Sequence, residues 1–192
     1  MVNVGFIVEG NTEKIVIDSP QFRGFLKSIN ISIIDPVIDA NGNGNLLPKN
    51  IEPFINRLKK ASAEKIVIIT DADQNSISQV KTRILPPDAS YKVDLIVVAV
   101  KAFEAWFLAC EELMKKVLCL PNYAMEYPEC TTNLPFEYIK EITTNNQGRG
   151  PGTKTAFARR VVQNGFSLKD AADHPNCPSA KFFLDSLLQF SN

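Results

Sequence analysis

Carboxylates follow two apolar stretches of the sequence at the point where each stretch ends. Asp71 and Asp73 come after a run of β-branched residues at 66–70, and Glu9 follows a second apolar run at 4–8. Buried parallel strands are typically such runs, and ligands of open α/β sheets bind just beyond the carboxyl ends of the strands. If the two strands are neighbours, the three acids meet at one edge of the sheet. Hard oxygen ligands gathered in this way suit Mg²⁺ or Mn²⁺, so the sequence predicts a metal site.

A metal held by these acids would support phosphate chemistry. A bound divalent ion orients a phosphate and stabilises charge on its oxygens, and Glu9 would exchange a proton with the attacking or leaving oxygen. The alternative is structural, because Asp and Glu are also favoured at helix starts as caps or through the helix dipole. Both interpretations apply to Glu104, which falls in the first turn of the helix expected after a strand at 93–100.

A basic segment near the C-terminus is the second chemical feature. Between Asn146 and Leu168 the chain has no acidic residue and four basic ones, Arg149, Lys154, Arg159 and Arg160. The segment is either a solvated helix face or an anion-binding surface. The stretch 148–155 resembles a phosphate-binding P-loop only superficially, because Thr153 precedes the lysine and no strand precedes the loop. Its backbone amides and Lys154 could still bind a phosphate at a helix N-terminus.

The elements that must position these residues alternate between strand and helix periodicity. Expected strands are 3–8, 31–38, 65–70 and 93–100, and the connecting helices include one interrupted at Ser19-Pro20, one at 50–61 and one at 76–84. This order predicts an α/β fold with a mostly parallel four-stranded sheet and helices on both faces. A helix to residue 118, a loop at 119–135 and helices at 136–142, 153–163 and 178–190 follow. We therefore expect an α/β domain at 1–118 and a C-terminal α-helical appendage at 119–192 packed on it.

The composition is that of an ordinary globular protein. The 192 residues are 45% hydrophobic and 22% charged, with 21 basic and 21 acidic side chains, so net charge neither favours nor excludes a nucleic-acid partner. No apolar run approaches the roughly 20 residues that span a bilayer, and no secretory signal is evident, so we expect a cytoplasmic protein without a membrane partner. The spacing of the four cysteines is unlike a zinc site, and the single His174 disfavours Ser/His or Cys/His nucleophiles.

Two motifs together carry a resemblance to a known family. Glu9-Gly10-Asn11-Thr12-Glu13 and Asp71-Ala72-Asp73, each after an expected strand, resemble the Toprim domain, the metal-binding module of topoisomerases, primases and OLD-type nucleases. The stretches 103–108 (FEAWFL) and 178–183 (PSAKFF) are similar to a Toprim-like family often found beside ATPases, and to RloB-type proteins. The resemblance covers nearly the whole chain and implies a Toprim-like, Rossmann-like fold.

The resemblance also implies roles for individual residues. Glu9 looks like the family's general acid/base and a metal ligand, and Asp71 and Asp73 look like its Mg²⁺-binding pair. Glu13 and Glu104 match further acidic positions. The chain differs from topoisomerases and primases in having no appended ATPase, no tyrosine-nucleophile domain and no zinc ribbon, so we do not expect those activities from it alone.

Three functions are consistent with these observations. The first is a Mg²⁺-dependent phosphodiesterase or nuclease, acting in defence against mobile DNA, with the basic residues of 146–168 on the phosphate backbone of DNA or RNA. The second is a non-catalytic or partner-dependent module that acts with an ATPase partner. The third, a small-molecule phosphotransfer enzyme, is disfavoured because no nucleotide-binding loop is evident. The sequence leaves substrate, partner and oligomeric state open.

Overall fold

A parallel sheet organises the computed structural model, which describes residues 1–145 and 150–190. Four strands pair in the order β2-β1-β3-β4, and every pair is parallel. Their bounds are β1 (Val2–Val8), β2 (Ile31–Asp39), β3 (Lys65–Asp71) and β4 (Leu95–Ala99). The predicted α/β fold is confirmed, and β1 and β3 are direct neighbours, as the metal-site prediction requires. The strand that contains Pro36, β2, is an edge strand of this sheet, where proline is tolerated.

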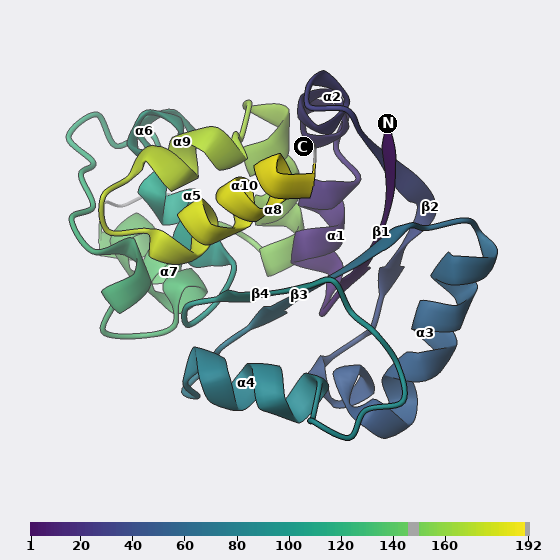
Figure 1. The fold of residues 1–192 in the computed structure, drawn as a ribbon. Helices are drawn as coiled ribbons and strands as arrows, with labels where there is room; N and C mark the ends of the chain where they lie inside the picture. Colours follow the sequence, from purple (N-terminus) through teal and green to yellow (C-terminus); the bar gives the residue numbers. More distant parts are fainter. Residues whose placement is uncertain (146–149, 191–192) are drawn as a thin grey trace.

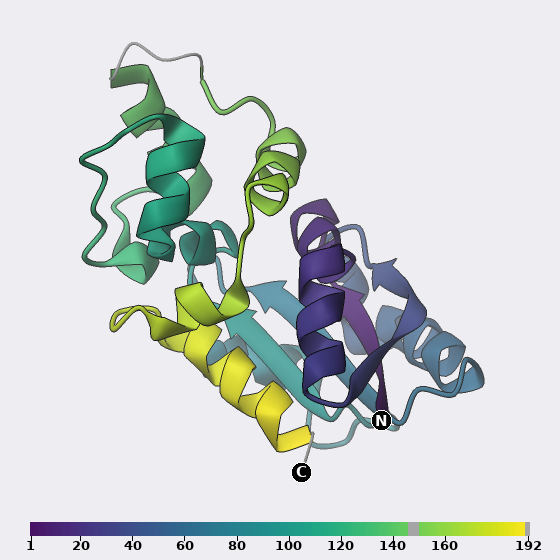
Figure 2. The same cartoon turned by 90° about the horizontal axis from the view of Figure 1, so that it is seen from above.

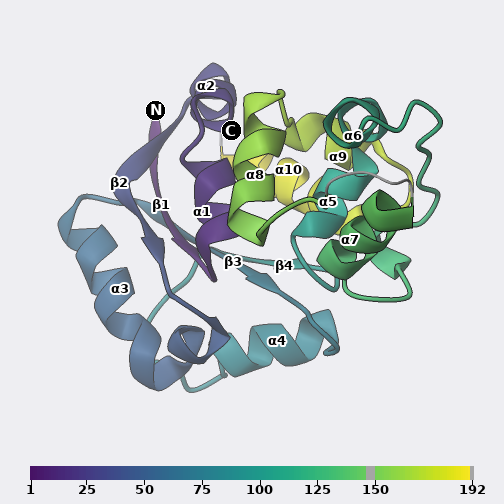
Figure 3. The same ribbon diagram turned by 180° about the vertical axis from the view of Figure 1, so that it is seen from behind.

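The helices that connect the strands cover both faces of the sheet (Figure 1). The connecting helices are α1 (Asn11–Ile17), α2 (Pro20–Ser28), α3 (Pro48–Lys60) and α4 (Ile77–Ile84), with a short 3₁₀ helix η1 (Asn43–Leu46) before α3. Figure 3 shows α3 and α4 on one side and α1 and α2 on the other. Ser19 caps α2 by accepting a hydrogen bond from the Phe22 amide at 3.1 Å, as its position before Pro20 predicted.

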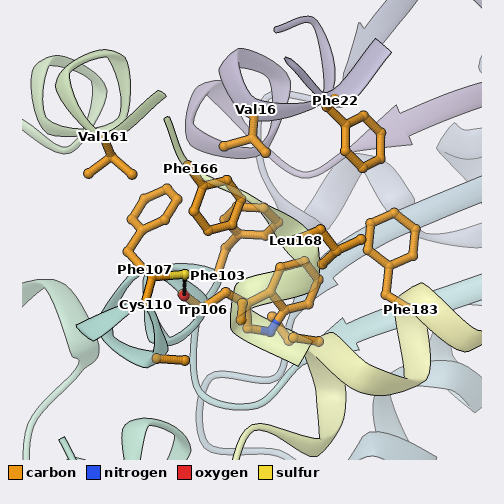
Figure 4. Close-up of a cluster of buried hydrophobic side chains, with 14 of the residues drawn as sticks. Val16, Phe22, Phe103, Trp106, Phe107, Cys110, Val161, Phe166, Leu168 and Phe183 are labelled. Atoms are coloured by element: carbon orange, nitrogen blue, oxygen red, sulfur yellow. Dashed lines mark hydrogen bonds between the residues drawn. The ribbon is translucent and has the colours of Figure 1, made fainter. Parts of the chain in front are cut away.

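Alternation along the strands divides the core into two parts. Val67 and Ile69 of β3 point to the α1 side, whereas Ile66 and Ile68 point to the α3 and α4 side. The α1 side is rich in aromatic rings: Trp106 and Phe183 stack with ring centroids 5.7 Å apart (Figure 4). The other side is mainly aliphatic. The sheet is therefore covered on both faces, which explains why its strands are continuous apolar runs.

The C-terminal part of the chain adds helices to the aromatic side of the sheet. These elements are α5 (Glu104–Ala109), α6 (Glu111–Leu118), η2 (Pro128–Cys130), α7 (Pro135–Asn145), α8 (Lys154–Gln163), α9 (Leu168–Asp173) and α10 (Pro178–Phe190). In Figure 2, α8 lies beside α1 and α10 runs along β4, and both pairs are in contact. The helices share one hydrophobic cluster with the strands. The division of the chain at residue 118 stays a prediction.

Two helices differ from the sequence prediction. The helix expected to run to residue 118 is broken at Cys110, where ψ is 76° and α6 begins anew. The reason is tertiary: the Tyr123 hydroxyl donates to the Leu108 carbonyl at 2.9 Å, a carbonyl that a continuous helix would use itself. Helix α9 was not predicted. Its signal was nevertheless present, because Ser167 caps it by accepting from the Asp170 amide at 3.3 Å.

Two simpler expectations can be compared with the structure directly. Cys110 is 4% exposed and packs in the core, as expected for a cysteine in an apolar helical stretch, and Cys177 is also a buried free thiol. Within residues 1–145 and 150–190, no helix combines the length and the apolar character needed to cross a bilayer.

Candidate functional site

Glu9 and Asp71 lie next to each other at the carboxyl ends of the paired strands β1 and β3. One carboxylate oxygen of Glu9, Oε2, accepts hydrogen bonds from the Thr70 hydroxyl at 2.5 Å and from the Asp71 amide at 3.1 Å. Thr70 is fully buried, so its side chain has a fixed place from which to donate. The end of β3 therefore orients the carboxylate that ends β1.

Asp71 connects the sheet to helix α5. Its Oδ1 accepts from the amide of Phe103 at 2.8 Å, and Phe103 immediately precedes α5. The next residue, Glu104, is only 2% exposed. The hydrogen bond thus fixes the start of α5 beside β3 and places a buried glutamate there, so Glu104 does more than interact with the dipole of an exposed helix.

Glu13 approaches the same place from helix α1. It is 5% exposed, and its Oε2 accepts from the Gly10 amide at 3.1 Å. The sequence suggested that Asn11 or Thr12 caps α1, and this prediction is wrong: Gly10 holds the N-cap position. Gly10 has no side chain with which to cap the helix, so the carboxylate of Glu13 occupies the space above its first turn. Capping thereby turns Glu13 towards the ends of the strands.

These carboxylates line one pocket of about 260 Å³ together with a lysine. The charged residues around it are Glu9, Glu13, Asp39, Asp71, Glu104 and Lys154. The structure therefore brings five of the predicted site residues together. Asp39 was not among them, although its signal was available, because it ends the strand next to β1. Its Oδ1 accepts from the Asn41 amide at 2.7 Å, which shapes the loop at the rim of the pocket.

Lys154 comes from the far end of the chain. It is the first residue of α8, and its Nζ lies 3.3 Å from Glu104 Oε2. Its side chain is 47% exposed, so the ammonium group faces both the acids and solvent. Burial alone would lower the pKa of Lys154, but the pKa is raised because Glu104, Asp71 and Glu13 attract its charge more strongly.

Two acids of the pocket have raised pKa values, because burial and neighbouring acids disfavour their charged forms. Burial, together with repulsion from Glu104 and Glu9, raises the pKa of Glu13 to about 7. Burial, followed by repulsion from Glu13, Glu104 and Glu9, raises the pKa of Asp71 well above its ordinary value. Lys154 only partly offsets this repulsion. Raised pKa values of this kind, caused by burial and by like charges, are typical of functional sites.

The remaining predicted residues lie elsewhere. Asp73 is exposed, adopts a left-handed conformation with φ of 52°, and is not among the described residues that line the pocket. Its amide donates to the Lys101 carbonyl at 2.8 Å. Arg159 is exposed, and Arg160 lies over the ring of Phe157; neither lines the pocket. Arg149 lies outside the described residues.

The pocket contains oxygen donors of the type that binds a divalent cation, but among the described residues the donors are not arranged as a metal site. Carboxylate oxygens are the ligands that Mg²⁺ and Mn²⁺ prefer. Across the described ranges 1–145 and 150–190, however, no three His, Cys, Asp or Glu side chains are grouped so that they could hold a metal ion. The metal role of Glu9, Asp71 and Asp73 stays a prediction.

A buried polar network positions α5 from behind. Ser179, at the start of α10, accepts from the indole nitrogen of Trp106 at 2.7 Å and donates to Glu129 at 2.5 Å. Glu129 is 4% exposed and also accepts from the Ser179 amide at 3.0 Å. The two sequence stretches at 103–108 and 178–183 therefore meet through Trp106 and Ser179. Sequence reasoning missed Glu129, which lies in the expected loop at 119–135.

Comparisons with known proteins add one structural likeness. No family model matches the chain, and no curated protein matches it significantly. The chain is similar to the solved C-terminal region of the OLD protein of Xanthomonas campestris pv. campestris, with 17% sequence identity and a TM-score of 0.45. The match covers 98% of this chain and 95% of that one. Membership of a Toprim-like family stays a prediction.

Proposed function

We propose that this protein is a Mg²⁺- or Mn²⁺-dependent enzyme that cleaves phosphodiester bonds in nucleic acid. The observation that carries the proposal is the convergence of five carboxylates, two of them buried, and one lysine on a pocket beyond the carboxyl ends of β1 and β3. The acids come from four separate segments, which local helix capping would not bring together. The finer expectation, a role in defence against mobile DNA, comes only from the family resemblance.

In this proposal Glu9 and Asp71 hold the metal, with Glu13 beside them. When bound, the ion would stabilise negative charge on the phosphate oxygens and lower the pKa of a water molecule. The raised pKa values of Glu13 and Asp71 support this assignment, because a bound cation would offset both the burial and the repulsion that raise them. Asp73 lies two residues after Asp71 and outside the pocket lining, and it remains a further candidate ligand.

The other groups of the pocket act on protons and on the phosphate. Glu9 is oriented through Oε2 and exchanges a proton with the attacking or leaving oxygen. Lys154 binds a phosphate oxygen, and its half-exposed ammonium group can reach one without leaving the pocket rim. Glu104 keeps Lys154 charged and in place. Arg159 and Arg160, farther along α8, would contact the substrate backbone, and Arg149 remains a further candidate from the sequence.

The test is a comparison of Asp71→Asn with Asp88→Asn. Asparagine keeps the oxygen that accepts from the Phe103 amide but removes the charge. We expect Mg²⁺ binding by calorimetry to be lost in Asp71→Asn, together with about a 100-fold or larger loss of cleavage of plasmid DNA or single-stranded RNA. Asp88 is exposed and lies outside the pocket, so its variant should behave like the wild type.

The possible results separate the functions cleanly. Circular dichroism would first confirm that both variants are folded. Metal-dependent cleavage that survives Asp71→Asn would refute the proposed site. Metal binding by the wild type without any cleavage would instead favour the partner-dependent module acting with an ATPase.

A further inference from the structure

A second hollow is lined by residues of α6, α9 and the segments 124–126 and 174–176. Its volume is about 630 Å³, and it shares no lining residue with the acidic pocket of the candidate site. Its lining is mostly apolar, and Ala109, Cys110 and Met125 are buried there. We call this hollow the α6–α9 groove. Helix α5 separates the two features, with Glu104 at its first residue and Ala109 at its last.

The rim of the groove carries charge of one sign. Its charged residues are all acidic, namely Glu111, Glu112, Glu126, Asp170 and Asp173, and no lysine or arginine of the described chain lines it. Asp170 and Asp173 are exposed, and neither forms an ion pair with a described basic residue. Glu112 pairs with Lys115, at 2.6 Å. Most of the negative charge is therefore not compensated from within the described chain.

Hydrogen bonds hold the walls of the groove in place. The His174 ring contacts the Met125 carbonyl through Nε2 at 2.8 Å and accepts from the Asn176 amide through Nδ1 at 3.1 Å. The Asn176 side chain donates to the Glu126 carbonyl at 2.8 Å, and Glu111 accepts from the Met125 amide at 3.0 Å. The segment at 124–126 is thus tied to 174–176 and to α6. A preformed groove loses little conformational freedom when it binds a ligand.

We propose that the α6–α9 groove binds a segment of a partner protein in which lysine or arginine side chains stand beside apolar ones. The floor accommodates apolar side chains and the aliphatic stems of the basic residues, while the rim carboxylates contact their charged ends. Nucleic acid does not fit this surface, because its phosphates and the rim carry like charge. A small inorganic cation would leave the apolar floor uncovered. The proposal is independent of the metal-dependent activity.

The experiment measures the binding of three fluorescein-labelled seven-residue peptides by anisotropy. The probe alternates arginine and leucine, one control has glutamate for arginine, and the other has serine for leucine. The proteins are the wild type, Asp170→Asn/Asp173→Asn, and the control Asp88→Asn/Glu141→Gln, which removes two exposed carboxylates outside the groove. We expect about a tenfold loss of affinity in the groove variant, and a loss of less than about twofold in the control.

Each other outcome overturns the proposal. Equal affinity in the groove variant and the control would mean that the groove is not the binding surface. Equal binding of the serine peptide would mean that the apolar floor takes no part, and binding of the glutamate peptide would remove the electrostatic argument. Light scattering that shows a dimer dissociated by Asp170→Asn/Asp173→Asn would assign the groove to a second copy of this chain instead. Asp71→Asn should bind the probe like the wild type, which separates this test from that of the proposed function.

Discussion

The candidate site and the α6–α9 groove both gather carboxylates, but they differ in how far the acids are removed from water. Glu13 and Glu104 are 5% and 2% exposed, whereas Asp170 and Asp173 of the groove stand in solvent. Buried acids that lie together repel one another with little screening, and exposed acids do not. Burial and mutual repulsion therefore raise the pKa values of Glu13 and Asp71 at the end of the sheet. At the groove, the carboxylates contribute negative charge to the surface.

Glu129 shows that burial alone does not decide whether a carboxylate is structural or available for a ligand. It is as buried as Glu13 and Glu104, and burial raises its pKa, although hydrogen bonds from Ser179 and Cys177 offset part of the rise. Glu129 thus lies among donors and His174, which lower its pKa, whereas Glu13 accepts from the Gly10 amide but also lies beside Glu104 and Glu9, which raise its pKa. The comparison teaches that donors alone do not separate the two cases, because the site acids also accept hydrogen bonds. What distinguishes Glu13 and Asp71 is the like charge of neighbouring acids, which a bound cation could offset.

The largest expected effect on stability concerns Glu13 and pH. Its pKa lies at about 7 in the folded protein against an ordinary 4.5, so the folded state binds the proton more tightly. Without divalent cations, the free energy of unfolding should therefore fall as pH rises from 4.5 through 7, by up to about 3 kcal/mol from this residue. In urea denaturation with EDTA, Glu13→Gln should gain stability relative to the wild type between pH 5 and pH 8.

The control for this measurement is Asp88→Asn, whose free energy of unfolding should equal that of the wild type between pH 5 and pH 8. Parallel pH profiles for Glu13→Gln and the wild type would mean that the acids of the site do not repel one another. The acids of the site would then not differ in this respect from the exposed acids of the groove.

A smaller effect is expected for Ser179→Ala, which tests the role of donors around Glu129. The change leaves the Trp106 indole without its hydrogen-bond partner and removes one of the three described donors of Glu129, which keeps the Ser179 amide and the Cys177 thiol; it should cost about 1–3 kcal/mol of unfolding free energy. Denaturation can be followed by the fluorescence of Trp106, the single tryptophan, whose emission should also shift. Ser186→Ala is the matched control on the same helix, because its hydroxyl bonds only to the Phe182 carbonyl. Equal stabilities of the two variants would contradict a role for the network.

The smallest effect is expected at the groove. Asp170→Asn/Asp173→Asn should change the free energy of unfolding by no more than about 0.5 kcal/mol, because both side chains are exposed and unpaired within the described chain. Thermal unfolding at pH 7 is sufficient to measure it. A much larger change would show that these acids serve folding, and the groove would no longer contrast with the site.

Much of the site could be predicted because the strands that carry Glu9 and Asp71 are specified by short stretches of sequence. The β-branched run before Asp71 and the apolar run before Glu9 determine two buried parallel strands, and strand ends lie at a common edge wherever the strands are neighbours. Ser19-Pro20 likewise determined the start of α2 through groups within one helical turn. Even α9 was readable from Ser167 and Asp170, although it was not predicted.

Other features were decided only by the tertiary structure, because they depend on groups far apart in the chain. Packing of α8 against α1 brings Lys154 to Glu104, 50 residues away in sequence, and the Tyr123 hydroxyl breaks the helix at Cys110. The sequence by itself placed Glu9 and Asp71 at the ends of two buried strands, since apolar runs and turn residues act locally, and the structure showed that these strands are neighbours. Whether neighbouring acids would be buried together, satisfied by donors or left in solvent depended on long-range packing, and that packing sets the charge each of them can carry.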